Sequence, residues 1–126
     1  MRKDFALDCA VRAASKIRRP IAEIRFVLVG DRKMSALHKK FMSLSGTTDV
    51  LTFELSAPRE PLEGEIYICL DQARRQARDY RVPLFQEIAR LATHGVLHLA
   101  GYDDLTDARR VKMRRMEDLT LAGACA

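Results

Sequence analysis

The sequence predicts an α+β fold, close to α/β in its order of elements, in which a small mixed β-sheet packs against helices. Helical and strand patterns follow one another in the order helix, strand, helix, strand, strand, helix, helix, helix. The chain has 126 residues, which is enough for a single hydrophobic core but not for two. No repeat, linker or low-complexity segment divides it, so we expect one domain over residues 1–126.

The first half of the chain opens with a helix and a strand. Residues 4–17 place their apolar side chains on one side of a helix, and Pro20 lies just beyond it. Residues 23–29 are rich in β-branched side chains and end at Gly30, a pattern typical of a buried strand.

A second helix is predicted over residues 31–42, where Asp31 is placed to cap it. The side chains predicted to face inward from this helix are Met34, Leu37 and Phe41. After a loop of small residues, positions 50–55 alternate as a strand. The side chains on one face of that strand are Leu51, Phe53 and Leu55.

The middle of the chain predicts a loop, a third strand and a third helix. Residues 57–63 contain two prolines and form the loop, and residues 64–70 alternate as the strand. Asp71 is placed to cap the helix that follows. The inward stripe of that helix is predicted to be Ala73, Ala77 and Tyr80.

A fourth helix carries two of the three histidines. Pro83 is well placed as its first residue, and Glu87 near its start favours the helix dipole. Apolar side chains fill one arc of the helix, and His94 and His98 fall together at the edge of that arc. Such a helix can hold two imidazoles at the floor of a cleft while it buries its other side chains.

Residues 94–104 have the form H-x-x-x-H-x-x-G-x-x-D, which predicts a metal site. Residues four apart on a helix lie on one face, so His94 and His98 can bind the same transition metal. Gly101 can leave the helix in a left-handed conformation and bring Asp104 back as a third ligand. On spacing alone, Asp103 could take that place. Three protein ligands leave a fourth position for water, as in catalytic zinc sites.

This arrangement is similar to the H-E-x-x-H signature of zinc peptidases, with one decisive difference. Those enzymes carry their general-base glutamate directly after the first histidine, and the chain has Gly95 there. A metallopeptidase mechanism therefore lacks its base in this motif.

The formal net charge of +5 permits a polyanionic partner. Basic residues crowd two predicted helices: Arg74, Arg75, Arg78 and Arg81 in one, and Arg109, Arg110, Lys112, Arg114 and Arg115 in the other. The second of these is the last helix, begun by Asp104 or Thr106 and ending near Leu121. Each set can form a solvated helix face or a surface that contacts phosphates. Only 6% of the residues are aromatic, so base stacking on an exposed aromatic platform is not expected.

Two features bear on where the protein acts. No apolar run approaches the 18 residues of a membrane span, and the N-terminus lacks the apolar core of a signal peptide. Cys9, Cys69 and Cys125 are scattered and odd in number, which indicates free thiols. We therefore expect a cytoplasmic protein that is neither exported nor bound to a membrane.

Three segments together resemble the YbeY-type rRNA maturation factors, proposed single-strand endoribonucleases of bacteria. The family signature has the form H-G-x-L-H-L-x-G-Y-D-H, and residues 94–104 match it at every fixed position except the last. The family segment T-D-V-L-S-F appears as T-D-V-L-T-F at 48–53. A third segment, G-D-I-x-I, appears as G-E-I-Y-I at 64–68. The resemblance covers nearly the whole chain.

The resemblance implies a fold related to zinc-peptidase catalytic domains. It also implies one bound metal ion per chain, and Zn²⁺ is the ion expected. The family's three histidine ligands fall on His94, His98 and Asp104, and aspartate is an acceptable zinc ligand. The resemblance also implies work on ribosomal RNA, including maturation of small-subunit rRNA and ribosome quality control. The ribosome or its small subunit is then the expected partner, and DNA is not.

A second departure from the family lies before the 48–53 segment. The family has an arginine in a segment of the form L-N-x-x-Y-R, and the matching position here is Met42. An arginine facing the metal can hold a phosphate and stabilise developing negative charge, which methionine cannot do. Lys39 or Lys40 could substitute as point charges, and His38 could donate to a phosphate, ligate a metal or simply be solvated.

These observations give a working hypothesis. A metal held by His94, His98 and Asp104 activates water for cleavage of single-stranded RNA. The side chains predicted to hold RNA phosphates are Lys39, Lys40, Arg109 and Arg110. Asp103 can orient a ligand from behind or be an ordinary turn residue, and Asp49 can line the cleft or cap a turn. A ribosome-associated factor that keeps a structural metal is the main alternative.

Overall fold

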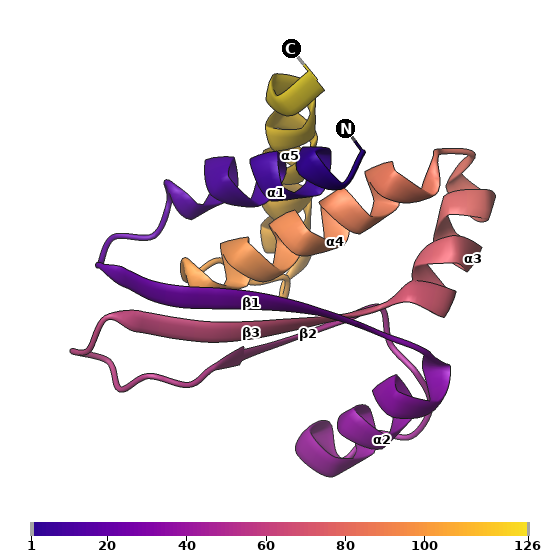
Figure 1. Ribbon diagram of the computed structural model, residues 1–126, viewed down its shortest axis with the longest axis horizontal. Helices are drawn as coiled ribbons and strands as arrows, with labels where there is room; N and C mark the ends of the chain where they lie inside the picture. The colour runs from indigo at the N-terminus through magenta and orange to yellow at the C-terminus, as the bar shows by residue number, and fades with distance from the viewer. Residues whose placement is uncertain (1, 126) are drawn as a thin grey trace.

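A three-stranded mixed sheet lies at the centre of the computed structural model, which describes the backbone of residues 2–125 and the side chains of residues 4–124 (Figure 1). The strands are β1 (Ile21–Val29), β2 (Val50–Glu54) and β3 (Leu62–Cys69). β3 is the middle strand, parallel to β1 and antiparallel to β2. β2 is therefore an edge strand, and one of its sides is left open beside the candidate site.

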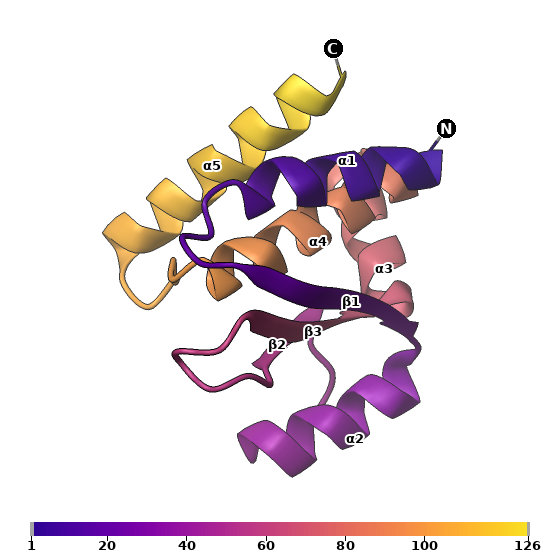
Figure 2. The ribbon, with the colours of Figure 1, turned by 60° about the vertical axis from the view of Figure 1, so that its left-hand side comes forward.

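Five helices surround this sheet among the described residues: α1 (Arg2–Ala14), α2 (Asp31–Met42), α3 (Leu70–Tyr80), α4 (Leu84–Leu99) and α5 (Asp107–Cys125). Figure 2 shows the layers: α1 and α4 cover one face of the sheet, α2 lies on the other, and α5 crosses outside α4 and α1. This arrangement confirms the predicted α+β fold.

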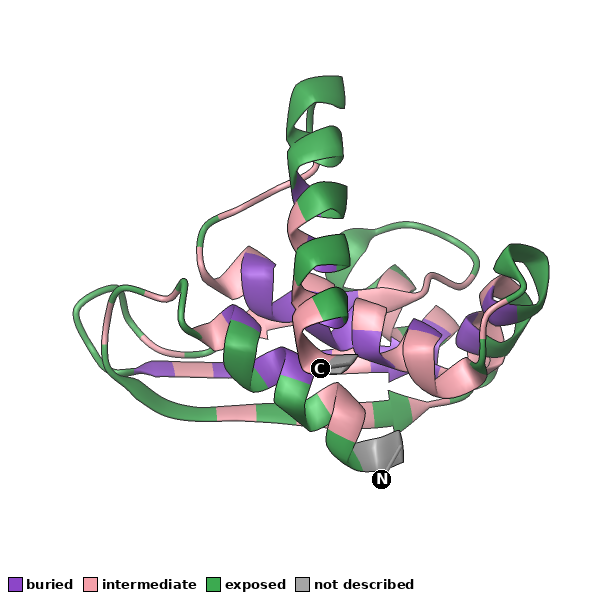
Figure 3. Ribbon diagram, turned by 90° about the horizontal axis from the view of Figure 1, so that it is seen from above, coloured by how far each residue is buried: buried purple, intermediate pink, exposed green. Residues whose placement is uncertain are grey.

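The main core lies between the sheet and α4, which is buried along most of its length (Figure 3). Its members are Ala10, Ala13, Ile66, Ile68, Ala73, Leu91, Ala92, Val96, Leu97 and Met113. A smaller cluster of Met34, Leu51 and Cys69 lies under α2. Because α4 is enclosed by the sheet and by three other helices, the histidines that it carries are held on a rigid element.

Several boundaries differ from the prediction. β3 begins at Leu62, inside the predicted 57–63 loop, because its first residues pair with β1. Pro83 is the N-cap of α4, not its first helical residue, and has an extended ψ of 148°. Two side chains predicted to face inward, Phe41 and Tyr80, are instead about half exposed. Leu55, predicted to lie in the strand with Leu51 and Phe53, follows the last residue of β2.

The predicted helix caps are also wrong in an informative way. The N-cap positions of α2 and α3 are Gly30 and Cys69, and neither makes a side-chain capping bond. The carboxylate of Asp71 in α3 instead accepts a hydrogen bond from the Asp31 backbone N–H at 2.8 Å. Arg75 donates to both carboxylate oxygens of Asp31, at 2.9 and 2.7 Å, and lowers the pKa of that carboxyl to about 2. A side chain of α3 thus caps the N-terminus of α2.

Gly95 lies where α4 packs closely against the sheet. A Cβ atom built there would lie 2.7–3.0 Å from three side-chain atoms of Ile66 on β3. Ile66 is fully buried in the core and cannot move aside cheaply. Gly95 stands where zinc peptidases carry their general-base glutamate, and here its lack of a side chain lets α4 pack against Ile66.

We expect Gly95→Ala to destabilise the fold by about 1–3 kcal/mol, because the added methyl overpacks a filled core. Urea unfolding gives the free energy of unfolding. Gly123 is the control, because its added Cβ would meet only Arg12 Nη1 at 3.4 Å. Gly123→Ala should be neutral or stabilising by up to about 1 kcal/mol. Equal stability of the two variants would contradict this account of Gly95.

Within the described part of the chain, no helix is both long and apolar enough to cross a bilayer. The thiols of Cys9 and Cys69 are buried. The side chain of Cys125 lies outside the described residues.

Candidate metal centre

His94 and His98 lie one turn apart near the C-terminal end of α4, on the side that faces β2. The helix spacing sets their rings 4.6 Å apart between centroids. The two Nε2 atoms face each other at 3.0 Å. Both rings are partly buried, so they stand at the rim of the core as the sequence predicts.

The chain turns back after α4 through a Schellman motif. The N–H of Tyr102 bonds to the carbonyl of Leu97, and the N–H of Gly101 bonds to that of His98. Gly101 has a φ of +101°, in the region that favours glycine. This turn returns Asp104 to the histidines: its Oδ2 lies 3.6 Å from His94 Nε2, and its Oδ1 lies 4.0 Å from His98 Nε2.

The three side chains fit a transition metal. Donor atoms of His94, His98 and Asp104 all lie within 4.8 Å of one another, and this group could hold a metal ion. Two imidazole nitrogens bound tetrahedrally to zinc are separated by about 3.3 Å, close to the 3.0 Å between the Nε2 atoms. Two ring nitrogens this close need a proton or a cation between them, because two lone pairs repel.

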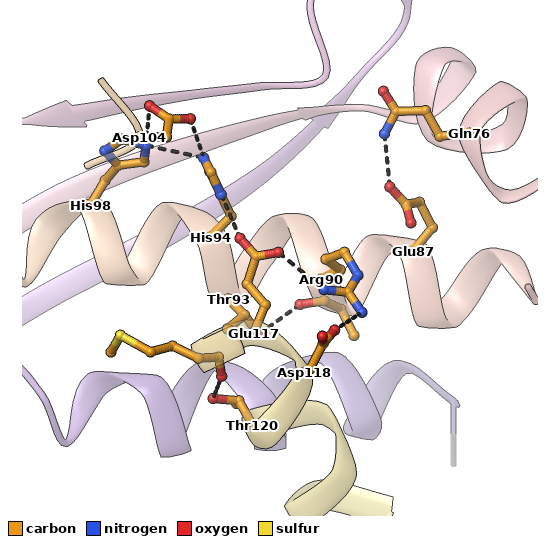
Figure 4. Close-up of polar contacts among 12 residues, drawn as sticks. Gln76, Glu87, Arg90, Thr93, His94, His98, Asp104, Glu117, Asp118 and Thr120 are labelled. Carbon is orange, nitrogen blue, oxygen red and sulfur yellow. Dashed lines mark hydrogen bonds and ion pairs between the residues drawn. The ribbon is translucent and has the colours of Figure 1, made fainter. Parts of the chain in front are cut away.

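Glu117 contacts the His94 ring on the side away from the candidate metal site. The sequence does not predict this role for Glu117. Its Oε2 accepts a hydrogen bond from His94 Nδ1 at 2.6 Å, on the opposite side of the ring from His98 and Asp104 (Figure 4). A proton fixed on Nδ1 leaves Nε2 with a free lone pair directed at the site. A carboxylate in this position also makes the ring a stronger ligand. Glu117 is only 4% exposed, so the contact is built into the core.

Arg90 holds Glu117 in turn. It donates to Glu117 Oε1 at 3.1 Å and to Asp118 at 2.7 Å, so the buried carboxylate is paired on both oxygens. Burial lowers the pKa of His94, but the hydrogen bond and charge of Glu117 outweigh it and the pKa is raised overall. The pKa of His98 is lowered, by burial and then by the charge of His94. His98 therefore favours the neutral form that a metal needs.

Residues 5–124 match the sequence model of the family described as endoribonuclease YbeY. The chain belongs to the YbeY family.

Curated relatives agree with this assignment. Endoribonuclease YbeY of Anaeromyxobacter sp. is 44% identical over 100 residues, covering 76% of this chain and 52% of the relative. The YbeY protein of Desulfitobacterium hafniense is 38% identical over 111 residues, covering 80% of this chain and 71% of the relative. That of Flavobacterium psychrophilum is 35% identical over 96 residues, covering 76% and 68%. The chain thus spans about half the length of the first relative and about two thirds of the other two.

A solved structure has a similar fold. The solution structure of TM1509 from Thermotoga maritima matches with a TM-score of 0.64 and 25% identity. The match covers 98% of this chain and 78% of the other.

Met42 stands where the family resemblance expects an arginine, and it lies in the same cleft as the candidate metal ligands. Met42 lines a cleft of about 510 Å³ that also includes His38, Asp49, His94 and Asp104. Met42 is about half exposed. His38 points its Nδ1 at the carbonyl of Gly46, 3.0 Å away, so one ring nitrogen is engaged in the loop.

The other residues singled out in the sequence fall into two groups. Asp49 lines the cleft at the start of β2, whereas Asp103 makes turn contacts. Its Oδ1 accepts the Leu105 N–H at 3.0 Å, and its Oδ2 accepts from Arg109 at 3.1 Å. Asp103 thus has the contacts of an ordinary turn residue.

Four basic residues were predicted to contact RNA: Lys39, Lys40, Arg109 and Arg110, and all four are exposed. Lys39 and Lys40 lie in the last turn of α2. Arg110 pairs with Asp107 and donates to the Asp104 carbonyl at 3.2 Å. The structure therefore brings Arg110 to the loop that carries Asp104, while Arg109 is paired with Asp103.

Proposed function

We propose that this protein is a metal-dependent endoribonuclease that cleaves single-stranded RNA. Membership of the YbeY family supports RNA as the substrate. The observation that carries the proposal is the convergence of His94, His98 and Asp104 at the edge of an open cleft. We further propose that the substrate is ribosomal RNA, in small-subunit maturation and ribosome quality control in the cytoplasm, with the ribosome or its small subunit as partner.

The donor set favours zinc, because two imidazoles and one carboxylate match three-ligand catalytic zinc sites. When bound there, zinc would supply Lewis acidity at a phosphodiester oxygen and lower the pKa of water towards 7. The chain's own residues prepare the site. Glu117 fixes the tautomer and the orientation of His94, and the turn at Gly101 aims the carboxylate of Asp104. The negative charge of Asp104 also favours a cation between the imidazoles.

Peptide hydrolysis fits the site poorly. The position of the peptidase general base is Gly95, which packs against Ile66 in the core. No carboxylate can therefore reach the cleft from that position. Lys39 and Lys40 are exposed and directly follow His38, which lines the cleft, and cations there suit phosphates better than an uncharged peptide.

A non-catalytic ribosome-associated factor is the second candidate function. The observation in its favour is Met42, which leaves the cleft without the arginine that the family resemblance places there. In this alternative the same three residues hold a metal that serves only to stabilise the fold.

Cleavage assays on three substrate classes test the proposal. Zinc-loaded protein is incubated with a single-stranded rRNA fragment, its perfect duplex and an unstructured protein such as casein. We expect cuts in the single strand only, and their loss on chelation. Stoichiometric metal without any cutting would favour the non-catalytic factor, and cuts in casein would favour a peptidase.

Met42→Arg is expected to raise the rate of RNA cleavage by about 10- to 100-fold, because a guanidinium in the cleft can stabilise phosphate charge. Single-turnover rates on the single-stranded fragment measure the effect. Met42→Leu is the control and should leave the rate within about twofold, because neither side chain carries charge. A rate in Met42→Arg no higher than in Met42→Leu would show that the cleft does not need the missing cation.

A further inference from the structure

A second cavity, of about 590 Å³, lies between α3, α4 and α5 and meets the cleft at the metal site. The two hollows share Asp49, His94 and Asp104 as lining residues. A substrate bound at the histidines could therefore extend from one hollow into the other.

Tyr80 forms part of the wall of this cavity at the end of α3. The helix pattern predicts it to be buried, but the side chain is 53% exposed. The Arg114 guanidinium carbon on α5 lies 5.9 Å from the ring centroid. Proteins hold unstacked RNA bases by stacking them on aromatic rings or on guanidinium planes, and Tyr80 and Arg114 offer one of each.

The lining also includes a buried polar pair. Glu87 is 2% exposed, and its Oε2 accepts a hydrogen bond from Gln76 Nε2 at 2.7 Å (Figure 4). The other carboxylate oxygen of Glu87 is a further acceptor among the residues that line the cavity. Gln76 also has a second amide hydrogen. Together they present a donor and an acceptor side by side, the pattern that pairs with the edge of a nucleobase.

The charges of the cavity leave two arginines to meet an anion. Arg90 is already paired with Glu117 and Asp118, and Arg110 is paired with Asp107. Arg114 and Arg115 are exposed and line the cavity without an ion pair in the described part of the chain. A phosphate at the cavity mouth would gain from both cations.

We propose that this cavity is a nucleotide subsite, which holds one unstacked nucleotide of an RNA strand beside the bond at the metal site. The base stacks on Tyr80 and bonds by its edge to Gln76 and Glu87, and its phosphate meets Arg114 and Arg115. The assignment of RNA as the bound strand rests on the proposed function. The nucleotide chemistry of the cavity rests on its own lining residues.

Calorimetric titration with nucleoside monophosphates tests the subsite without any cleavage. The probes are adenosine 5′-monophosphate and uridine 5′-monophosphate, with adenosine and inorganic phosphate as partial ligands. We expect a monophosphate to bind tighter than either partial ligand. Tyr80→Leu and Arg114→Gln should each weaken it by about 10-fold. Arg78→Gln, an exposed arginine on α3 that does not line the cavity, should bind as the wild type does.

Because Tyr80 and Arg114 are exposed, both variants should keep the wild-type melting temperature, so weaker binding reports the contact and not the fold. Absence of nucleotide binding by the wild type, or binding unchanged in both variants, would overturn the subsite.

Cleavage kinetics then separate the subsite from the proposed function. If the wild type cuts single-stranded RNA, Tyr80→Leu should raise KM by about 10-fold and change kcat little. An unchanged KM would overturn the subsite and leave the nuclease proposal standing. If the wild type cuts no RNA, the nuclease proposal fails, and the monophosphate titration alone decides whether the cavity binds nucleotides.

Discussion

His94→Ala is expected to lower the rate of RNA cleavage by at least about 10³-fold, because it removes a metal ligand and with it several kcal/mol of charge stabilisation. The variant also loses the ring that Glu117 and Asp104 hold in place. Bound zinc per chain and the single-turnover rate are measured on the same sample. Both should fall together, since the three donor side chains act as one site.

His38→Ala is the matched control for this prediction. His38 is the third histidine of the chain and lines the same cleft, but it does not belong to the group of close donor atoms. The variant should keep one zinc per chain. Loss of zinc from His38→Ala, with zinc retained in His94→Ala, would mean that the ligand set has been assigned wrongly.

Glu117→Gln is expected to weaken zinc binding by about 10-fold, and Glu117→Ala by up to about 100-fold. The glutamine can still accept the His94 Nδ1–H but no longer carries the charge. The alanine removes both the acceptor and the charge and leaves the ring free to rotate. Competition with a chelator of known affinity gives the dissociation constants, and cleavage at saturating zinc should recover in the glutamine variant.

Asp118→Asn separates this effect from simple loss of packing. Asp118 also pairs with Arg90 but is exposed and does not contact His94. Its zinc affinity should stay within about twofold of the wild type. If Asp118→Asn weakened zinc as much as Glu117→Gln, the effect would belong to the Arg90 network and not to the contact with His94.

The parts of the site that the sequence predicts are local ones. His94 and His98 are four residues apart on one helix, so periodicity alone places them together. The turn at Gly101 follows from glycine at a helix end, and Asp104 is only three residues further on. Each inference needs no more than the geometry of a helix and its C-cap.

The parts that the sequence does not reveal depend on contacts between distant segments. Glu117 reaches His94 only because α5 crosses α4, and neither its spacing nor its neighbours mark it among the other charges of α5. The exposure of Tyr80 likewise depends on how the end of α3 packs in the whole fold, which the periodicity of α3 does not give. Asp71 caps α2 and not its own helix, because β1 and β3 set those two helix starts side by side. Local patterns cannot encode such packing.

Zinc titration of the chelated protein tests the central claim most directly. Zinc is added back in steps, and cleavage of the single-stranded rRNA fragment is followed together with the zinc bound per chain. Cleavage should rise in proportion to bound zinc and reach a plateau at one ion per chain. Cleavage that is already complete in the metal-free protein, or absent at full occupancy, would contradict a nuclease centre at His94, His98 and Asp104.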